Sequence, residues 1–320
     1  MAGDLSPRKY FRGEKDGRTS IIMLYPQADD EAREELRDFI KITTWLARQG
    51  VKVPAVLALD EELACAHFED LGTKSFGDVR RAGADMAPYY TLACDVLKHL
   101  KDAPCPDDFP RYRESRVHHK RRQLVEYYLP LERGRKFTDA EMESYLAAWE
   151  EVEASLPPCP QGFLHMDYHL ENLMWVEGEE GIRRCGLIDY QDAVCGPLPY
   201  DLVNLLEDAR VDVPQDLKAD ILARYCEGLE GEETKAFRDW YDLLAAQFHS
   251  RVIGLFTMQA AERGRDDYVV HIPRLQKYLL TALEKPVLAP FKRWCTQVGL
   301  DFAPINDLNG DVIRKTFKSF

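Results

Sequence analysis

The stretch His-Met-Asp-Tyr-His-Leu-Glu-Asn, residues 165–172, sets two histidines, an aspartate and an asparagine within eight positions. Apolar segments flank it, and a polar EGEEG turn and a second apolar segment follow, so we expect it at the entrance of a β-hairpin. On a strand, His165, Asp167 and His169 would share one face and could ligate a metal ion. The histidines could instead be a hydrogen-bonded pair in the core, or the stretch could be a catalytic loop.

The catalytic-loop interpretation also accounts for a second acidic cluster, LIDYQD, at the end of the expected hairpin. Phosphoryl transfer requires one carboxylate to orient the attacking hydroxyl, and oxygen ligands for the magnesium ions that bridge the phosphates. Magnesium prefers such hard oxygen donors. In this interpretation Asp167 is the catalytic base, and Asn172 and Asp189 are the Mg²⁺ ligands.

The motif HxDxHxxN, followed by LIDYQDAVCGPLPYDL, resembles the aminoglycoside phosphotransferase and choline kinase family, which shares the bilobal protein-kinase fold. The resemblance implies ATP as the phosphate donor and the same roles for Asp167, Asn172 and Asp189. It also implies that three residues support the catalytic loop: His165, His169 and Asp201. Asp201 by itself could also be the N-cap of the helix that begins LVNLLED.

A narrower resemblance extends over nearly the whole chain. Five segments are similar to those of bacterial kinases that phosphorylate the anomeric hydroxyl of N-acetylmuramate and N-acetylglucosamine during cell-wall sugar recycling: RKYFR, IIMLYP, FEDLG, GLIDYQDAVCGPLPYDLVNLLEDARVDV and the later VIGLF…DYVVHIPRLQKYL. This resemblance implies an N-acetylated amino sugar as the acceptor. Two alternatives stay open, namely an aminoglycoside, choline or other alcohol as the acceptor, and a nucleotide-binding regulatory pseudokinase without turnover.

The pattern of the remaining chain predicts an α+β, bilobal protein-kinase-like fold. Residues 19–25 read as a strand, residues 31–50 as an amphipathic helix, and the apolar runs 53–59 and 63–68 as an antiparallel pair. We expect residues 1–72 to form a small β-rich lobe with a hinge at about 69–72. We expect residues 73–320 to form a larger, mainly helical lobe that carries the catalytic loop, the metal-binding hairpin and the acceptor site.

The nucleotide site departs from the protein-kinase pattern at one position. Met23 stands where the strand lysine of a kinase would pair with the nucleotide phosphates. The expected phosphate-covering loop, GDLSPRKYF, offers other cations, so we expect the compensating charge among Arg8, Lys9 and Arg12, with ordinary surface charge as the alternative for each. The first strand of the lobe is expected to be absent or very short. Backbone groups near Glu69 and Leu71 are expected to bind the adenine.

Acceptor contacts are expected from the helical lobe, and four side chains are candidates: Tyr168, Asp192, His249 and Arg251. A structural role is the alternative for each of them. The basic run RYRESRVHHKRRQ, residues 111–123, is interpreted as a solvated helix face rather than a binding patch.

Composition limits the class of partner. The net charge of −13 disfavours sequence-independent binding to nucleic acid, so the partner is expected to be a small molecule. The eight cysteines form no CxxC pair, which excludes a zinc ribbon and a thioredoxin-like motif. The polar start is unlike a signal peptide, and no run reaches the roughly 18 apolar residues of a membrane helix, so we expect a cytoplasmic protein without a membrane partner.

Overall fold

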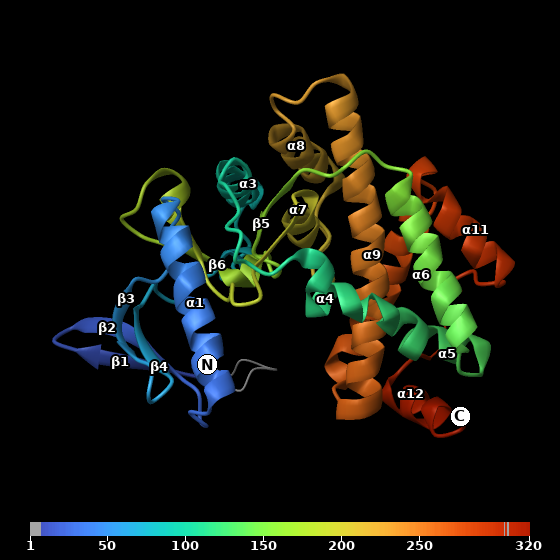
Figure 1. Ribbon diagram of the computed structural model, residues 1–320, viewed down its shortest axis with the longest axis horizontal. Helices are drawn as coiled ribbons and strands as arrows, with labels where there is room; N and C mark the ends of the chain where they lie inside the picture. Colours follow the sequence, from blue (N-terminus) through green and yellow to red (C-terminus); the bar gives the residue numbers. More distant parts are fainter. Residues whose placement is uncertain (1–7, 304, 306) are drawn as a thin grey trace. The chain divides into compact units, whose positions relative to one another are not determined.

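The computed structural model describes residues 8–303, 305 and 307–320, which form two compact units (Figure 1). The first, here called the sheet unit, combines Met1–Phe109, Gly162–Val194 and Asp220–Tyr225. The second, the helical unit, combines Pro110–Gln161, Cys195–Ala219 and Cys226–Phe320. One unit contains an antiparallel sheet and the other is mainly helical, as the predicted α+β class requires. The predicted lobe boundary at residue 72 falls inside the sheet unit and stays a prediction.

The sheet unit begins with a four-stranded antiparallel sheet of order β1-β2-β4-β3. Its strands are β1 (Lys9–Lys15), β2 (Arg18–Leu24), β3 (Val56–Asp60) and β4 (Cys65–Glu69). The strand expected to be absent or very short would precede the phosphate-covering loop and lies outside the described residues, so that expectation stays a prediction. The end of that loop, residues 9–11, is part of β1 instead. The turn between β1 and β2 was readable in the sequence, because Asp16-Gly17 is a strong two-residue hairpin turn, and both residues have the positive φ that such a turn requires, 52° and 73°.

The register of the sheet decides which side chains share a face. Tyr10 lies opposite Met23, and Met23 lies opposite Ala66. Since side chains alternate along a strand, Arg12 lies on the same face as Met23, whereas Lys9 lies on the opposite face. Met23 is fully buried on this inner face.

Helix α1 (Asp30–Arg48) covers the inner face of the sheet (Figure 1). The Asp29 side chain caps its first turn by accepting a hydrogen bond from the Ala32 N–H at 2.9 Å. Phe39 of α1 meets Phe68 of β4 edge to face at 5.5 Å between ring centroids and stacks on Tyr190 at 5.0 Å. This apolar contact ties the helix to both the sheet and the segment that contains Tyr190.

The rest of the sheet unit carries the stretch that opened the sequence analysis. It contains α2 (Phe76–Arg81), α3 (Ala87–Lys101), the 3₁₀ turns η4 (Leu170–Asn172) and η5 (Gly181–Arg184), and the strands β6 (Leu173–Trp175) and β7 (Cys185–Leu187). β6 and β7 pair antiparallel with Leu173 opposite Leu187. The predicted hairpin is therefore present, and residues 165–172 stand at its entrance.

The helical unit is arranged around one long helix, α9 (Gly231–Arg263), and Figure 1 shows α6 (Asp139–Ala154) beside it. Its other elements are η1 (Tyr112–Glu114), α4 (Arg116–His119), η2 (Lys120–Arg122), the π-helical turn η3 (Leu124–Tyr128), α5 (Leu129–Arg133), α7 (Pro199–Leu206), η6 (Asp266–His271), α10 (Ile272–Ala282), η7 (Pro286–Leu288), α11 (Ala289–Gln297) and α12 (Gly310–Phe317). Helix α8 (Gln215–Tyr225) has residues in both units, and β5 (Gln161–Leu164) pairs with β8 (Val194–Pro197).

The basic run at 111–123 does not form a single solvated helix face. It is divided among η1, α4 and η2, and both Tyr112 and His118 within it are buried. Short turns replace a continuous helix here, so the run presents side chains in several directions.

Helix α9 packs very closely on the π-helical turn through Gly254. A Cβ atom built at Gly254 would lie 2.2 Å from the carbonyl carbon of Gln123. We therefore expect Gly254→Ala to destabilise the protein by roughly 1–3 kcal/mol, the usual cost of an overpacked contact. Denaturant unfolding measures this. Helix propensity alone predicts the opposite sign, a gain of about 1 kcal/mol, so a more stable variant would contradict the close contact.

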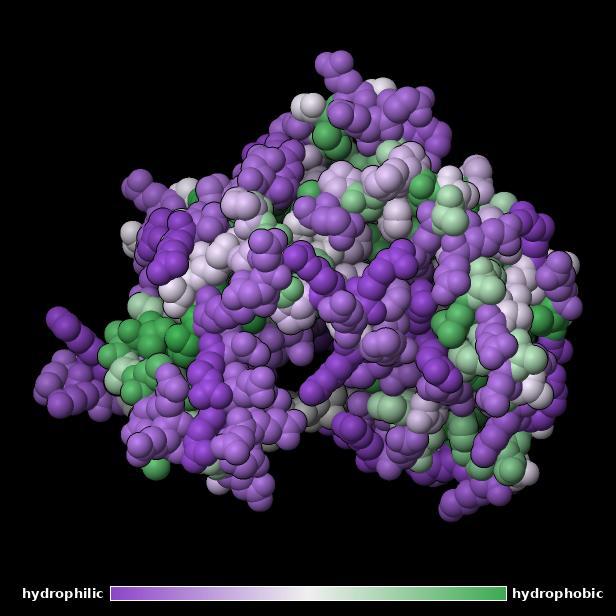
Figure 2. Space-filling view, in the orientation of Figure 1, coloured by the Kyte–Doolittle hydropathy of each residue, from purple (hydrophilic) through white to green (hydrophobic). Residues whose placement is uncertain are grey.

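The strands β1–β3 and the following turn expose large apolar side chains, visible as the green area over these strands in Figure 2. Phe11, Leu57 and Leu63 are each more than half exposed, at 51%, 55% and 65%. Across the part of the chain that the structure describes, no helix has the length and apolar content to cross a bilayer.

Candidate active site

The start of the loop at residues 165–172, the candidate catalytic loop, is fixed by His165, which is 1% exposed. Its Nε2 lies 3.0 Å from the Ile188 carbonyl oxygen, and its Nδ1 accepts the Asp167 N–H at 3.3 Å. Burial lowers the pKa of His165 to about 4, so the ring is neutral and can donate at Nε2 while accepting at Nδ1. His165 is thus fully engaged with the backbone, and the structure does not support a metal site of His165, Asp167 and His169.

Asp167 is held by two side chains of its own loop. His169 Nε2 lies 3.2 Å from Asp167 Oδ1, and the Asn172 amide nitrogen donates to the Asp167 backbone oxygen at 3.0 Å and to Oδ2 at 3.2 Å. His169 is oriented in turn, because its Nδ1 accepts the Glu171 N–H at 3.3 Å. The Asp167 side chain is half exposed, so a fixed carboxylate is presented where a substrate could reach it.

Asp189 follows β7 in a left-handed conformation, with φ of 63°. The Arg8 guanidinium lies 4.0 Å from its Oδ1. Burial raises the pKa of Asp189, the charge of Asp167 raises it further, and the charge of Arg8 opposes both. Two carboxylates therefore lie near each other, and they repel unless a cation is between or beside them.

The donor set at this site fits magnesium. Because the Asn172 amide nitrogen is turned toward Asp167, its Oδ1 is left for a ligand, and the Asp189 carboxylate supplies a second hard oxygen. Among the described residues, no group of three or more His, Cys, Asp or Glu side chains is arranged to hold a metal by itself. Magnesium needs no such group, since it takes one or two protein oxygens together with substrate phosphates.

The three basic side chains predicted to pair with the nucleotide phosphates have different surroundings in the structure. Lys9 lies on the outer face of the sheet. Arg12 is on the inner face, but it binds Asp70 at 2.8 Å and the Gly72 carbonyl oxygen at 2.8 Å. Arg8, which is 8% exposed, is the one of the three beside Asp189. Residues 3–7 of the expected phosphate-covering loop lie outside the described residues.

The two hinge candidates have different surroundings. The Glu69 N–H donates to the Ala55 carbonyl oxygen at 2.8 Å, and its carboxylate holds Lys52 at 2.7 Å. Leu71 packs with Met174, Val176 and Ile188 below the hinge. Lys52, which also lies 3.4 Å from Glu179, was missed because a lone lysine in VKVP carries no sequence signal for a buried ion pair.

A second missed feature joins α2 to the catalytic loop. The Arg81 guanidinium donates two hydrogen bonds to the Glu171 carboxylate, of 2.6 and 3.0 Å, and Glu171 directly precedes Asn172. A Cβ atom at Gly77 would lie 2.2 Å from the Glu171 carboxylate, so a larger residue there would displace this side chain from its contact with Arg81. The Ser75–Asp78 capping box that opens α2 was readable in the sequence, but its partner loop was not.

We expect Arg81→Ala to lower turnover by roughly 10-fold, because Glu171 would release the turn that positions Asn172 and Asp167. The matched control is Arg135→Ala, which removes two hydrogen bonds to Glu141 in the helical unit. The two arginines are equally exposed, Arg81 at 51% and Arg135 at 52%. Exposed ion pairs contribute little to stability, so the two variants should have similar melting temperatures. Equal turnover in the two variants would show that the Arg81 contact does not position the loop.

The four acceptor candidates are divided between the units. In the sheet unit, Tyr168 is fully buried and its hydroxyl donates to the Ala93 carbonyl oxygen at 2.9 Å, whereas Asp192 is exposed. In the helical unit, His249 is 2% exposed, and Arg251 lies over the Phe248 ring. These surroundings favour the structural alternative for Tyr168 and His249. Asp201, the proposed loop support, is buried in the first turn of α7.

Comparison with known proteins adds sequence evidence. The model of the phosphotransferase enzyme family, APH, matches residues 1–241. An N-acetylmuramate/N-acetylglucosamine kinase of Caulobacter vibrioides is 33% identical over 80% of this chain and 73% of its own length. A protein of the same name from Pseudomonas putida is 31% identical over 90% of this chain and 84% of its own length.

Solved structures add evidence on the fold. The choline kinase LicA from Streptococcus pneumoniae matches with a TM-score of 0.57 and 14% identity, over 88% of this chain and 92% of that one. A microcompartment-associated aminopropanol kinase matches with a TM-score of 0.57 and 16% identity, over 94% of this chain and 93% of that one. These likenesses confirm the predicted kinase-like α+β fold.

Proposed function

Because this chain belongs to the phosphotransferase enzyme family, we propose that it moves the γ-phosphate of ATP to the anomeric hydroxyl of N-acetylmuramate or N-acetylglucosamine. The kinase class rests on the family and on relatives that are themselves kinases, as the sequence resemblance predicted. The assignment of the acceptor rests on one observation, that relatives named for these two sugars match 80–90% of the chain. An enzyme that consumes ATP on a recycled sugar would act in the cytoplasm, where ATP is available.

The residues of the catalytic loop support a direct transfer. Asp167 would accept a hydrogen bond from the anomeric hydroxyl and take its proton as the oxygen attacks the γ-phosphate. His169 and Asn172 would keep the carboxylate oriented, through the contacts already described. Asn172 Oδ1 and Asp189 would hold Mg²⁺, which neutralises phosphate charge when bound.

We propose that Arg8 supplies the phosphate cation that Met23 cannot. The proposal is supported by the position of Arg8 beside Asp189 and by the engagement of Arg12 at the hinge. Arg8→Gln is expected to weaken ATP binding and turnover together by roughly 10-fold or more, since a charge-assisted contact to phosphate contributes about 1.5–3 kcal/mol.

Steady-state kinetics with varied ATP measure this effect. Lys9→Gln is the matched control, because Lys9 is adjacent in sequence but lies on the outer face of the sheet. Equal losses in both variants would indicate a general charge effect and would contradict the proposed role of Arg8.

A coupled ADP-release assay with Mg-ATP tests the function as a whole. The panel contains N-acetylmuramate, N-acetylglucosamine, choline and kanamycin, and the sugar product is checked for an acid-labile phosphate. We expect turnover with the two sugars. Turnover with choline or kanamycin alone would replace the proposed acceptor, and nucleotide binding without turnover on any of the four would favour the regulatory alternative.

A further inference from the structure

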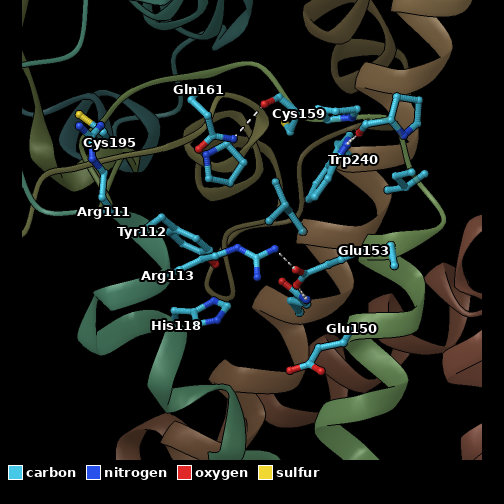
Figure 3. A pocket seen from close by; sticks show the side chains of 17 residues that line it. Arg111, Tyr112, Arg113, His118, Glu150, Glu153, Cys159, Gln161, Cys195 and Trp240 are labelled. Atoms are coloured by element: carbon cyan, nitrogen blue, oxygen red, sulfur yellow. Dashed lines mark hydrogen bonds and ion pairs between the residues drawn. The ribbon is translucent and has the colours of Figure 1, made fainter. Parts of the chain in front are cut away.

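A cavity of about 710 Å³ in the helical unit is lined by residues of that unit alone (Figure 3). Its charged lining residues are two arginines and two glutamates, namely Arg111, Arg113, Glu150 and Glu153, so their formal charges cancel. Arg113 donates a hydrogen bond to Glu153 at 2.7 Å, drawn as a dashed line in Figure 3. The cavity therefore selects no ligand by charge. The outer face of the sheet, in the other unit, keeps its charges apart from one another.

The strand register places a row of four side chains across the outer face of the sheet. In strand order the row contains Phe11, Ile22, His67 and Ala58, each paired with the next. The side chains of cross-strand partners lie on the same face, here the one opposite to the buried Met23. Phe11 is 51% exposed and Ile22 is 37% exposed, and Figure 2 shows an apolar area over these strands. The centre of this face is therefore apolar and open to solvent.

The neighbouring row on the same face carries opposite charges at its two ends. In strand order it contains Lys9, Leu24, Cys65 and Asp60, each again paired with the next. Lys9 is in β1 and Asp60 is in β3, which are the two edge strands of the sheet. Both residues are exposed, and neither forms an ion pair with another residue that the structure describes. Each charge is therefore available to a second molecule.

A two-fold axis parallel to the strands makes this face complementary to itself. Rotation about such an axis, placed between two stacked sheets, keeps each row at its level and sets the strand order β1-β2-β4-β3 against β3-β4-β2-β1. Lys9 of each copy then meets Asp60 of the other copy, and the large Phe11 meets the small Ala58. A two-fold axis perpendicular to the strands would instead set β1 on β1, with Lys9 near Lys15 of the other copy. The charges therefore favour the axis parallel to the strands.

The size of the face predicts a weak, concentration-dependent contact. Neighbouring strands lie about 4.8 Å apart and a strand of seven residues is about 23 Å long, so the face covers roughly 400–500 Å² per copy. Two stacked faces would bury roughly 900 Å², which is below the roughly 1,200 Å² of a standard stable interface. Stacked sheets align their strands within about 30°, so the facing rows stay near each other.

We propose that the outer face of the sheet is an interface between two copies of this chain, stacked about a two-fold axis parallel to the strands. The apolar row forms the centre of the interface, and the two Lys9–Asp60 pairs form its rim. Charged pairs at a rim determine the orientation of the partners more than the affinity. The interface is independent of the proposed function, since it uses neither the proposed catalytic base nor the proposed metal ligands.

Sedimentation of the full chain, from micromolar to near-millimolar concentration, tests the proposal. We expect the parent protein to pass from monomer to dimer as the concentration rises. We expect Phe11→Ser, Lys9→Glu and Asp60→Lys each to weaken the dimer about 10-fold or more, because they remove apolar contact or set like charges together at two symmetric positions. The matched control is Lys136→Glu in the helical unit, which changes the net charge as Lys9→Glu does and should leave the dimer unchanged.

A mixture of the two charge variants tests the orientation. When Lys9→Glu is mixed with Asp60→Lys, opposite charges meet at both contacts of the mixed dimer, so association should return to about the parent level. The double variant that carries both changes should associate equally well. Recovery in the mixture also shows that each single variant is folded.

Three results would overturn the proposal. The first is a parent protein that stays monomeric over the whole concentration range. The second is a loss of association in Lys9→Glu but not in Asp60→Lys, which would indicate pairing along the edge of β1 instead of stacking of the faces. The third is a pair of single variants with parent-like melting temperatures that stay monomeric when mixed.

Discussion

Replacing Asp167 by asparagine is expected to lower phosphate transfer by about 100-fold or more, the usual size of a general acid–base contribution. The amide keeps one oxygen that can accept the hydrogen bond from Asn172, which supports the shape of the loop. Its nitrogen replaces the oxygen that faces His169 Nε2, so the His169 contact is lost together with the ability to take the proton of the attacking hydroxyl. ATP affinity should therefore be unchanged while kcat falls.

Single-turnover measurements at saturating ATP separate this chemical effect from binding. The matched control is Asp311→Asn in α12, an identical change at a side chain that is 94% exposed. If Asp167→Asn retained near-normal turnover, another group would have to be the base, and the assignment of the catalytic loop would fail.

Replacing Asp189 by alanine should weaken magnesium-dependent nucleotide binding and also lower turnover by about 100-fold, because one of two protein oxygens for the metal is removed. Arg8 would also keep its positive charge without the Asp189 carboxylate beside it, which disfavours a further cation at the site. The variant should therefore respond far less to added Mg²⁺ than the parent protein.

Nucleotide titrations with excess Mg²⁺ and with a chelator measure this difference. With the chelator present, the parent protein and Asp189→Ala should bind nucleotide with the same affinity. With excess Mg²⁺, the nucleotide affinity of Asp189→Asn, which keeps one oxygen ligand, should be intermediate between those of the parent protein and Asp189→Ala. A variant that keeps the full magnesium effect would show that Asp189 is not a metal ligand.

Short-range patterns were the predictable part of the fold. The hairpin after the proposed catalytic loop and the helix expected at residues 31–50 each lie within one local segment, where spacing alone determines which groups meet. Strand β1 was missed although Asp16-Gly17 marked its turn, because residues 9–11 were interpreted as the end of the phosphate-covering loop.

Contacts between distant segments were the unpredictable part. Arg81 and Glu171 are 90 residues apart, and nothing in either local sequence indicates the other. The basic run at 111–123 was interpreted from its charge, whereas the burial of Tyr112 and His118 depends on α6 and α9 packing around it. Segments separated along the chain alternate between the two units, a division that sequence composition does not reveal.

The narrow fit at Gly77 also restricts how the sequence can change over generations. A larger residue at position 77 would push the Glu171 carboxylate aside, and a shorter residue at position 171 would remove that carboxylate; either change gives up the contact with Arg81. Position 77 is therefore restricted only as long as Arg81 and Glu171 are both kept, and loss of either partner releases it.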